Sequence, residues 1–281
     1  MADTVRARVY GAISLVNAIA AKKGATLGVD LVTEATVTKS NGSGIYVKSK
    51  SERLVSKTVK RSISKRLLKS HKITVSLSTQ IPAGYGLKSS SAISTAVALA
   101  CAKLFSKKID DDKVIRAGVA ASMDAGVSIT GAYDDACACY YGGFCVTDNW
   151  RKKLVVAKKA PRNLHAVIYI PYKRARGNPK RLRQMSKTFR RAWEMARLGD
   201  YWNAMILNGV AASSILNTDP KLIGALVGAG ALGVSVSGNG PAVAAVAKKP
   251  NITKVKKQFT RSQGRIITMP INCKKAHVYV L

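Results

Sequence analysis

Apolar and polar residues alternate along several stretches of the first half of the chain, a pattern typical of strands with one buried face. Strands are predicted in this half at residues 5–10, 27–37, 45–47 and 73–77, with a further strand ending at about 147. The cluster Asn41–Gly44 is expected to be the hairpin turn into the third of them. Helices are predicted at residues 54–68, 89–104 and 110–126, and the second, with serines at its start, is expected to be capped and buried.

The second half mixes strands and helices without a regular β-α-β order, which favours the α+β class. Its strands are predicted at residues 154–157, 166–170, 242–247, 266–269 and 277–280, and its helices at residues 179–198, 201–216 and 220–228. Asp148 and Asn149, followed by the basic run Arg151–Lys153, mark the expected boundary between an N-terminal domain (1–150) and a C-terminal domain (151–281).

Composition changes this picture mainly through charge. The 281 residues include 47 Lys plus Arg against 14 Asp plus Glu, a formal net charge of +33. Such a charge attracts anionic partners of any kind, including nucleotides, phosphorylated metabolites, RNA and acidic membranes. The hydrophobic content of 47% argues against a disordered chain.

Neither a membrane span nor a disulfide or zinc framework is expected. The uncharged stretch between Lys221 and Lys248 is interrupted by glycines, Asn239 and Pro241, so it is interpreted as a buried segment broken by a polar loop. The five cysteines form no Cys-x-x-Cys pair and the three histidines are scattered, so buried free thiols are expected. The residues before Tyr10 lack the apolar run of a signal peptide, and a cytoplasmic location is expected.

Three glycine-rich segments are candidates for binding phosphate. Residues 86–89 fail the P-loop pattern, because Leu87 separates the glycine from the lysine. The Gly-x-Gly-x-x-Gly segment 228–233 follows a predicted helix and precedes a strand, the reverse of the context that dinucleotide binding requires. In the third segment, 81–92, a strand ends at a proline, two glycines let the backbone turn, and Lys88 and three serines open a helix. Free N–H groups at a helix start favour phosphate oxygens, so this segment is interpreted as a nucleotide-phosphate loop.

This loop has the pattern Pro-x-x-x-Gly-Leu-x-Ser-Ser, which resembles the central ATP-phosphate motif of the GHMP kinases. Two further segments resemble the family's other motifs in the expected order: Thr130–Ala136, followed by Gly142 and Gly143, and Ser235–Ala242. Segments similar to the archaeal shikimate kinase branch of this family are Leu87–Ser91, Val16–Ala20, Lys23–Gly24 and Gly28–Asp30. The departures are a degenerate N-terminal motif and Lys88 in place of the commoner glycine.

The resemblance, which covers nearly the whole chain, implies a two-domain α+β GHMP kinase fold, with a ribosomal-protein-like N-terminal domain and an α/β C-terminal domain. It implies an enzyme that uses ATP and Mg²⁺ to phosphorylate the 3-hydroxyl of shikimate to shikimate 3-phosphate, on the chorismate route to aromatic amino acids. The residues expected to bind ATP are Pro82, Ala83, Gly84, Tyr85, Gly86, Leu87, Lys88, Ser89, Ser90, Ser91, Ala92, Gly238 and Gly240.

Six of the few acidic residues lie between positions 110 and 135. A kinase that acts on an alcohol needs a carboxylate for the hydroxyl and oxygen ligands for Mg²⁺. The resemblance implies that Asp134 is the catalytic base and that Ser90 and Asp124 hold Mg²⁺. The residues expected to bind the acceptor are Asn17, Lys23, Asp30 and Asp135, with Arg174 and Arg176 as further candidates.

Two alternatives stay open. Homoserine kinase or another GHMP small-molecule kinase would share the phosphate loops and use a different alcohol. A basic RNA-binding protein would fit the net charge, but the aromatic content is only 6% and no aromatic cluster offers a stacking surface. Because the basic residues gather at 48–72, 151–191 and 248–275, away from the glycine loops, the charge is interpreted as a surface property without a specific nucleic-acid partner. The oligomeric state is left open.

Overall fold

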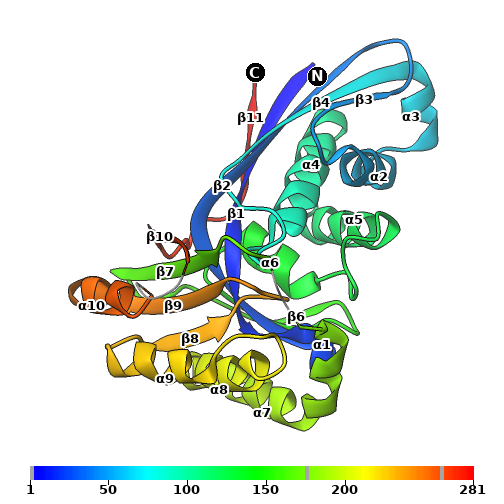
Figure 1. The fold of residues 1–281 in the computed structure, drawn as a ribbon. Coiled ribbons are helices and arrows are strands. Elements are labelled where there is room, and N and C mark those ends of the chain that lie inside the picture. The colour runs from blue at the N-terminus through cyan, green and yellow to red at the C-terminus, as the bar shows by residue number, and fades with distance from the viewer. Residues whose placement is uncertain (1–2, 175–176, 260–262) are drawn as a thin grey trace.

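The computed structural model describes residues 3–174, 177–259 and 263–281, which form two β-sheets with helices packed around them (Figure 1). Within these residues the first sheet has the order β11-β1-β2-β4-β3, with β5 paired to β2 and β6 to β5. Its strands are β1 (Thr4–Val16), β2 (Lys23–Asn41), β3 (Ile45–Lys48), β4 (His71–Thr79), β5 (Phe144–Asp148), β6 (Lys153–Lys158) and β11 (His277–Val280). The second sheet, in the order β10-β7-β9-β8, consists of β7 (Leu164–Pro171), β8 (Gly233–Val236), β9 (Val243–Lys248) and β10 (Gly264–Pro270).

Helices pack against both sheets. The N-terminal half contributes α1 (Ala18–Ala21), α2 (Glu52–Ser62), α3 (Lys65–Ser70), α4 (Ser89–Phe105), α5 (Asp111–Asp124) and α6 (Tyr133–Tyr141). The C-terminal half contributes α7 (Ser186–Arg197), α8 (Tyr201–Ser213), α9 (Pro220–Gly228), α10 (Ile252–Lys257) and the 3₁₀ helices η1 (Pro179–Met185) and η2 (Lys249–Asn251). Strands and helices mixed in this way confirm the predicted α+β class.

The burial of β1 shows how the sequence positions the centre of the molecule. Between Val5 and Val9 every second residue is buried, as expected of a strand with one covered face. From Tyr10 to Val16 all residues are buried, and the strand as a whole is contacted by α4, α6, α7 and α8. The segment therefore lies between helices from both halves of the chain, and the candidate site lies at its end.

The helix α4 confirms the prediction of a buried helix after the serines. Its small residues, Ala and Ser above all, are buried along most of the helix, and it packs on β1, β2, α2 and α5. A helix that is apolar on all sides is stable only inside a protein. The predicted side-chain cap is absent, however, because the residue that precedes the helix is Lys88, which makes no capping hydrogen bond with its side chain.

Two local predictions are wrong. Residues 41–44 do not form a hairpin: β2 pairs with β4 as far as Asn41, and β3 lies on the other edge of β4, parallel to it. The helix expected at 54–68 is two helices, because the side chain of Ser64 starts a second one by accepting a hydrogen bond from the Leu67 N–H group. In addition, α6 lies in a part of the chain for which the sequence predicts no helix.

The division into domains at residue 150 stays a prediction. Both β6 and β11 lie beyond that residue in sequence, yet they are hydrogen-bonded into the first sheet. In the described part of the chain, no helix is both long enough and apolar enough to cross a membrane. The five cysteines are free thiols, and four of them are buried, as predicted.

Candidate active site

Two glycines shape the predicted phosphate loop between β4 and α4. Gly84 and Gly86 have φ values of +83° and +82°, in the left-handed region that favours glycine. A Cβ atom on Gly86 would lie 1.8 Å from the backbone oxygen of Ser237. Only glycine therefore allows this loop to approach the segment that contains Ser237.

That segment, residues 237–242, joins β8 to β9 and is the second predicted ATP loop. The Ser237 hydroxyl donates a hydrogen bond to the Gly86 carbonyl at 2.9 Å, and the Ala242 N–H group donates one to the Tyr85 carbonyl at 3.3 Å. The two glycine loops, one from each sheet, are therefore in direct contact, although about 150 residues separate Gly86 from Ser237.

The loops enclose one end of a cavity of about 380 Å³. Residues of the first loop and of the start of α4 line one wall, and Asp134 and Asp135, from the first turn of α6, also line it. Among the residues predicted to bind ATP, those that line the cavity are Gly84, Gly86, Leu87, Lys88, Ser89, Ser90, Ser91 and Gly238. Those that belong to the same two segments without lining it are Pro82, Ala83, Tyr85, Ala92 and Gly240.

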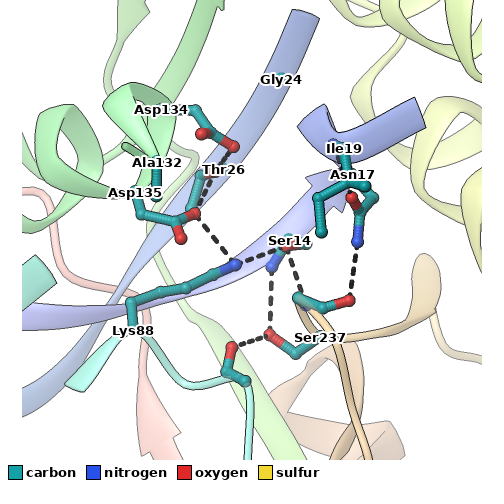
Figure 2. A network of polar contacts seen from close by, with 12 residues as sticks. Ser14, Asn17, Ile19, Gly24, Thr26, Lys88, Ala132, Asp134, Asp135 and Ser237 are labelled. Atoms are coloured by element: carbon teal, nitrogen blue, oxygen red, sulfur yellow. Dashed lines mark hydrogen bonds and ion pairs between the residues drawn. The ribbon is translucent and has the colours of Figure 1, made fainter. Parts of the chain in front are cut away.

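A buried polar network connects these walls (Figure 2). The Lys88 ammonium donates a hydrogen bond to the Ser14 hydroxyl at 2.7 Å and pairs with Asp135 Oδ1 at 2.9 Å. Ser14 Oγ also accepts a hydrogen bond from the Gly238 N–H group at 3.0 Å. Sequence reasoning missed Ser14, because a single serine in an apolar strand gives no recognisable signal.

Asp134 is held by neutral donors. Its side chain is buried, with Oδ2 accepting a hydrogen bond from the Thr26 hydroxyl at 3.1 Å and Oδ1 accepting one from the Asn149 amide at 2.7 Å. The carboxylate also lies against β2, where a Cβ atom on Gly24 would be 2.4 Å from Oδ2. Asp134 thus lines the cavity with its carboxylate fixed by these contacts, and it forms no ion pair within the described residues.

Asp135 has a different environment. Burial raises the pKa of its carboxyl to about 7, with Lys88 opposing this shift and Asp134 adding to it. Its Oδ1 lies 3.5 Å from the Thr26 hydroxyl oxygen, and Asp134 Oδ2 lies nearer to that oxygen, at 3.1 Å. Lys88, which the sequence assigned to phosphate, therefore belongs to the first glycine loop and pairs with one member of the acidic pair, Asp135.

The structure does not bring Lys23 and Asp30 to the cavity. Side chains alternate between the two faces of a strand; Gly24 and Thr26 face Asp134, so Lys23 points to the other face of β2. There its ammonium lies 4.0 Å from the centre of the Trp193 ring. Asp30 is exposed, because the pairing of β1 with β2 shifts register there and leaves it in a bulge.

Asp124, the predicted metal ligand, also lies outside the cavity. Arg61 of α2 binds both of its carboxylate oxygens, at 2.7 and 3.0 Å. These hydrogen bonds from Arg61 lower the pKa of the Asp124 carboxyl. The assignment of Asp124 as a metal ligand stays a prediction that this arrangement does not support, because both carboxylate oxygens accept hydrogen bonds from a guanidinium.

Of two other predicted residues, Asn17 lines the cavity and Arg174 lies beside the first glycine loop. The side-chain amide of Asn17 already makes two hydrogen bonds. Its Oδ1 accepts from the Ile19 N–H group at 2.9 Å, and its Nδ2 donates to the Gly238 carbonyl at 2.7 Å. Arg174 stacks over the Tyr85 ring, with its guanidinium 4.9 Å from the ring centre, beside the first glycine loop. Arg176 lies outside the described residues.

No group of three or more His, Cys, Asp or Glu side chains within the described ranges could hold a metal ion by itself. Ser90, Asp134 and Asp135 nevertheless line one cavity and offer hydroxyl and carboxylate oxygens. Such a set suits Mg²⁺, which usually keeps several waters and is bound through one or two protein groups together with nucleotide phosphates.

Comparison with known proteins agrees with this arrangement. The model of the GHMP kinases N-terminal domain matches residues 53–143, which include the first glycine loop, α4 and both cavity carboxylates. The chain is 35% identical to the shikimate kinase of Methanosarcina mazei over 94% of this chain and 92% of that protein. It is 34% identical to the shikimate kinase of Pyrococcus furiosus over 88% of this chain and 93% of that protein.

Solved structures share the fold at lower identity. A homoserine kinase from Cytophaga hutchinsonii superimposes with a TM-score of 0.78 at 21% identity, covering 99% of this chain and 98% of that one. The mevalonate kinase of Methanococcus jannaschii gives a TM-score of 0.71 at 13% identity, with coverage of 95% and 98%. With the same fold as these GHMP kinases and 34–35% identity to the archaeal enzymes over nearly their whole length, this chain belongs to the archaeal shikimate kinase family of the GHMP kinases.

Proposed function

We propose that this protein transfers the γ-phosphoryl group of ATP to the 3-hydroxyl of shikimate, forming shikimate 3-phosphate and ADP. The observation that carries the proposal is the 35% identity to proteins named shikimate kinase over 94% of the chain. The homoserine and mevalonate kinases that share the fold are only 21% and 13% identical. The identity therefore favours shikimate over homoserine and mevalonate as the acceptor.

The phosphate side of the reaction is assigned to the two glycine loops and α4. No side chain caps α4, so the N–H groups of its first turn are available to phosphate oxygens, and the helix dipole favours negative charge there. Lys88 adds a buried positive charge beside them. These groups stabilise the charge on the transferred phosphoryl group, which is the main contribution that a protein makes to phosphoryl transfer.

The acceptor side is assigned to Asp134. The oxygen of the 3-hydroxyl forms a bond to the γ-phosphorus, the bond from that phosphorus to the bridging oxygen of ADP breaks, and the hydroxyl proton moves to the Asp134 carboxylate. One lone pair of each carboxylate oxygen accepts from Thr26 or Asn149, which leaves another for the acceptor. Asn17 retains one amide hydrogen for a substrate hydroxyl, and Asp135 lies close enough to contribute to the same subsite.

Mg²⁺, when bound with ATP, would neutralise phosphate charge during the transfer. The Ser90 hydroxyl and the cavity carboxylates are the groups of this chain that would hold it. ATP as a substrate and thiols kept free fit a cytoplasmic protein, which we propose as its location.

The test is a coupled assay of ADP release with shikimate, homoserine, mevalonate and galactose in parallel. Turnover with shikimate is expected to exceed that with the other three alcohols by a wide margin, and a product analysis should find the phosphate on the 3-hydroxyl. Turnover confined to one of the other alcohols would exclude shikimate as the acceptor and leave the kinase assignment intact.

We propose that the net charge of +33 reflects the surface as a whole and serves no specific nucleic acid. Binding to RNA should then be independent of sequence and should fall steeply with salt. Tight binding to one RNA at about 0.2 M salt would contradict this and support a second role.

A further inference from the structure

A pair of buried polar side chains lies behind Asp134. The Asn149 amide nitrogen donates to Asp134 Oδ1 at 2.7 Å, and Asn149 itself is 6% exposed. Unlike Asp134, Asn149 does not line the cavity. It therefore contacts the carboxylate from the protein side and leaves the cavity side open to substrate.

Thr147 determines which way the Asn149 amide points. Its hydroxyl has one hydrogen, and the nearer acceptor is Asn149 Oδ1 at 2.6 Å, compared with the Gly24 carbonyl at 3.4 Å. The reversed amide would turn its oxygen toward the Asp134 carboxylate, which also only accepts when ionised. Only the observed orientation satisfies all three groups.

The backbone around this pair is also fixed. The Asn149 N–H group donates to the Lys22 carbonyl at 3.0 Å, and the Trp193 indole donates to the Thr147 carbonyl at 3.0 Å. The end of β5 is thus hydrogen-bonded to the residue that precedes β2 on one side and to α7 on the other. A side chain placed on such a support holds its partner within a narrow range of positions.

The partners of Asp134 are neutral, which matters for a base. A guanidinium or ammonium in the place of Asn149 would stabilise the ionised carboxylate and weaken its affinity for a proton. An amide donor fixes the carboxylate with a smaller effect on its basicity. The arrangement combines a fixed position with the ability to accept a proton.

We infer that Asn149, oriented by Thr147, is a positioning residue that holds the Asp134 carboxylate toward the acceptor hydroxyl. The inference rests on the proposed function in that it takes Asp134 as the base. Nothing in it depends on which alcohol is the acceptor.

Asn149→Ala removes the donor and is expected to lower kcat by roughly 10-fold to 10²-fold, because small displacements of reacting groups have effects of this size. The KM for ATP should change little, since Asn149 does not contact the phosphate loops. Asp148→Ala is the matched control: it removes the hydrogen bond from the Arg151 N–H group to Asp148 in the same turn without touching Asp134, and kcat should stay near that of the wild type.

Thr147 provides a second, gentler test. Thr147→Val keeps the shape of the side chain and removes the hydroxyl, so the amide loses the contact that orients it, and kcat should fall by less than about 10-fold. Thr147→Ser keeps the hydroxyl and should restore kcat. This pair tests the inference if Asn149→Ala fails to fold.

Asn149→Asp supplies a third test. An ionised carboxylate at this position cannot donate a hydrogen bond to Asp134, so kcat should fall at least as far as in Asn149→Ala, whereas the KM for ATP should again change little.

The outcomes separate the inference from the proposed function. If the wild type phosphorylates another alcohol and not shikimate, the proposed function fails, and the variants are compared with that alcohol. The inference is overturned if folded Asn149→Ala keeps the kcat of the wild type, if Thr147→Val and Thr147→Ser behave alike, or if folded Asn149→Asp keeps the kcat of the wild type.

Discussion

Asp134 and Asp124 lie at opposite ends of the segment that joins α5 to α6, and their surroundings differ in the charge of the partners. Asp134 is buried beside the cavity and accepts hydrogen bonds from a hydroxyl and an amide. Asp124 is partly exposed, lies outside the cavity and is bound through both oxygens by the guanidinium of Arg61. The first carboxylate is therefore available to a substrate and the second is not.

The same contrast applies to the two ion pairs of this region. The Lys88–Asp135 pair is buried, with 5% and 15% of the two side chains exposed, whereas the Arg61–Asp124 pair has 53% and 30% exposed. Removing one partner of a buried ion pair leaves an uncompensated charge in the interior, whereas solvent screens the attraction within an exposed pair. The comparison indicates that the partners and burial of a carboxylate, more than its place in a motif, decide what it can do.

The largest effect is expected for Asp134→Asn. This substitution keeps the size of the side chain and its hydrogen bond to Thr26 but removes the ability to take a proton, so kcat should fall on the order of 10²-fold or more. Nucleotide affinity should change little, because other residues contact the phosphates. Steady-state kinetics beside a thermal melt would measure this, and a folded variant with normal kcat would make Asp135 the next candidate for the base.

The next effect separates the two ion pairs. Lys88→Met leaves Asp135 buried without its cation and is expected to lower the free energy of unfolding by about 3 kcal/mol and to raise the KM for ATP. Arg61→Met, the matched control at the exposed pair, should change stability and kinetics little. Denaturant unfolding of both variants is the measurement, and equal losses of stability would contradict the difference in burial.

A smaller effect is expected in the pH dependence of stability. The pKa of Asp135 is raised to about 7 in the folded protein, above the value of about 4 in an unfolded chain. Between these two pH values the folded state holds the proton more tightly, so its stability should fall as pH rises from about 4 to about 7.

Asp135→Asn removes this titration, and its melting temperature should fall less over that range than that of the wild type. Melting curves of both proteins across the range provide the comparison. If the two proteins lose the same amount, Asp135 does not carry a raised pKa.

The smallest effects are expected for Asp124→Asn and Asp30→Asn. Neither carboxylate lines the cavity, so kcat and the Mg²⁺ concentration for half-maximal rate should stay at the wild-type values. A titration of activity with Mg²⁺ is the measurement. A higher Mg²⁺ requirement in Asp124→Asn would show that Arg61 releases this carboxylate in the working enzyme.

The parts of the molecule that follow from local sequence could be predicted. The glycines and serines of residues 81–92 specify a turn and a helix start within a few residues, and the small residues of α4 specify a buried helix. The glycine turn and the helix that follows it could therefore be predicted together, whereas phosphate binding by this loop stays a prediction. Asp134 and Asp135 were recognised through the segment that contains them, although α6 was missed, because a short helix buried on most sides shows no amphipathic period.

What could not be predicted depends on contacts between distant residues. The position of β3 depends on pairing with β4, and the fate of Asp124 depends on Arg61, 63 residues earlier. The face of β2 on which Lys23 lies follows from register, because a shift of one residue would reverse it. Ser14 contacts Lys88 and Gly238, and Asn149 contacts Asp134. These residues come together only in the folded chain.

The contact between Gly86 and Ser237 has a consequence for unfolding. It links a loop of the first sheet to a loop of the second at the wall of the cavity, so a nucleotide bound there would stabilise segments from both halves of the chain at once. At 100 times its Kd such a ligand adds about 2.7 kcal/mol to the free energy of unfolding. Hydrogen exchange should then slow together in α4 and in β8 and β9, as in a single cooperative unit.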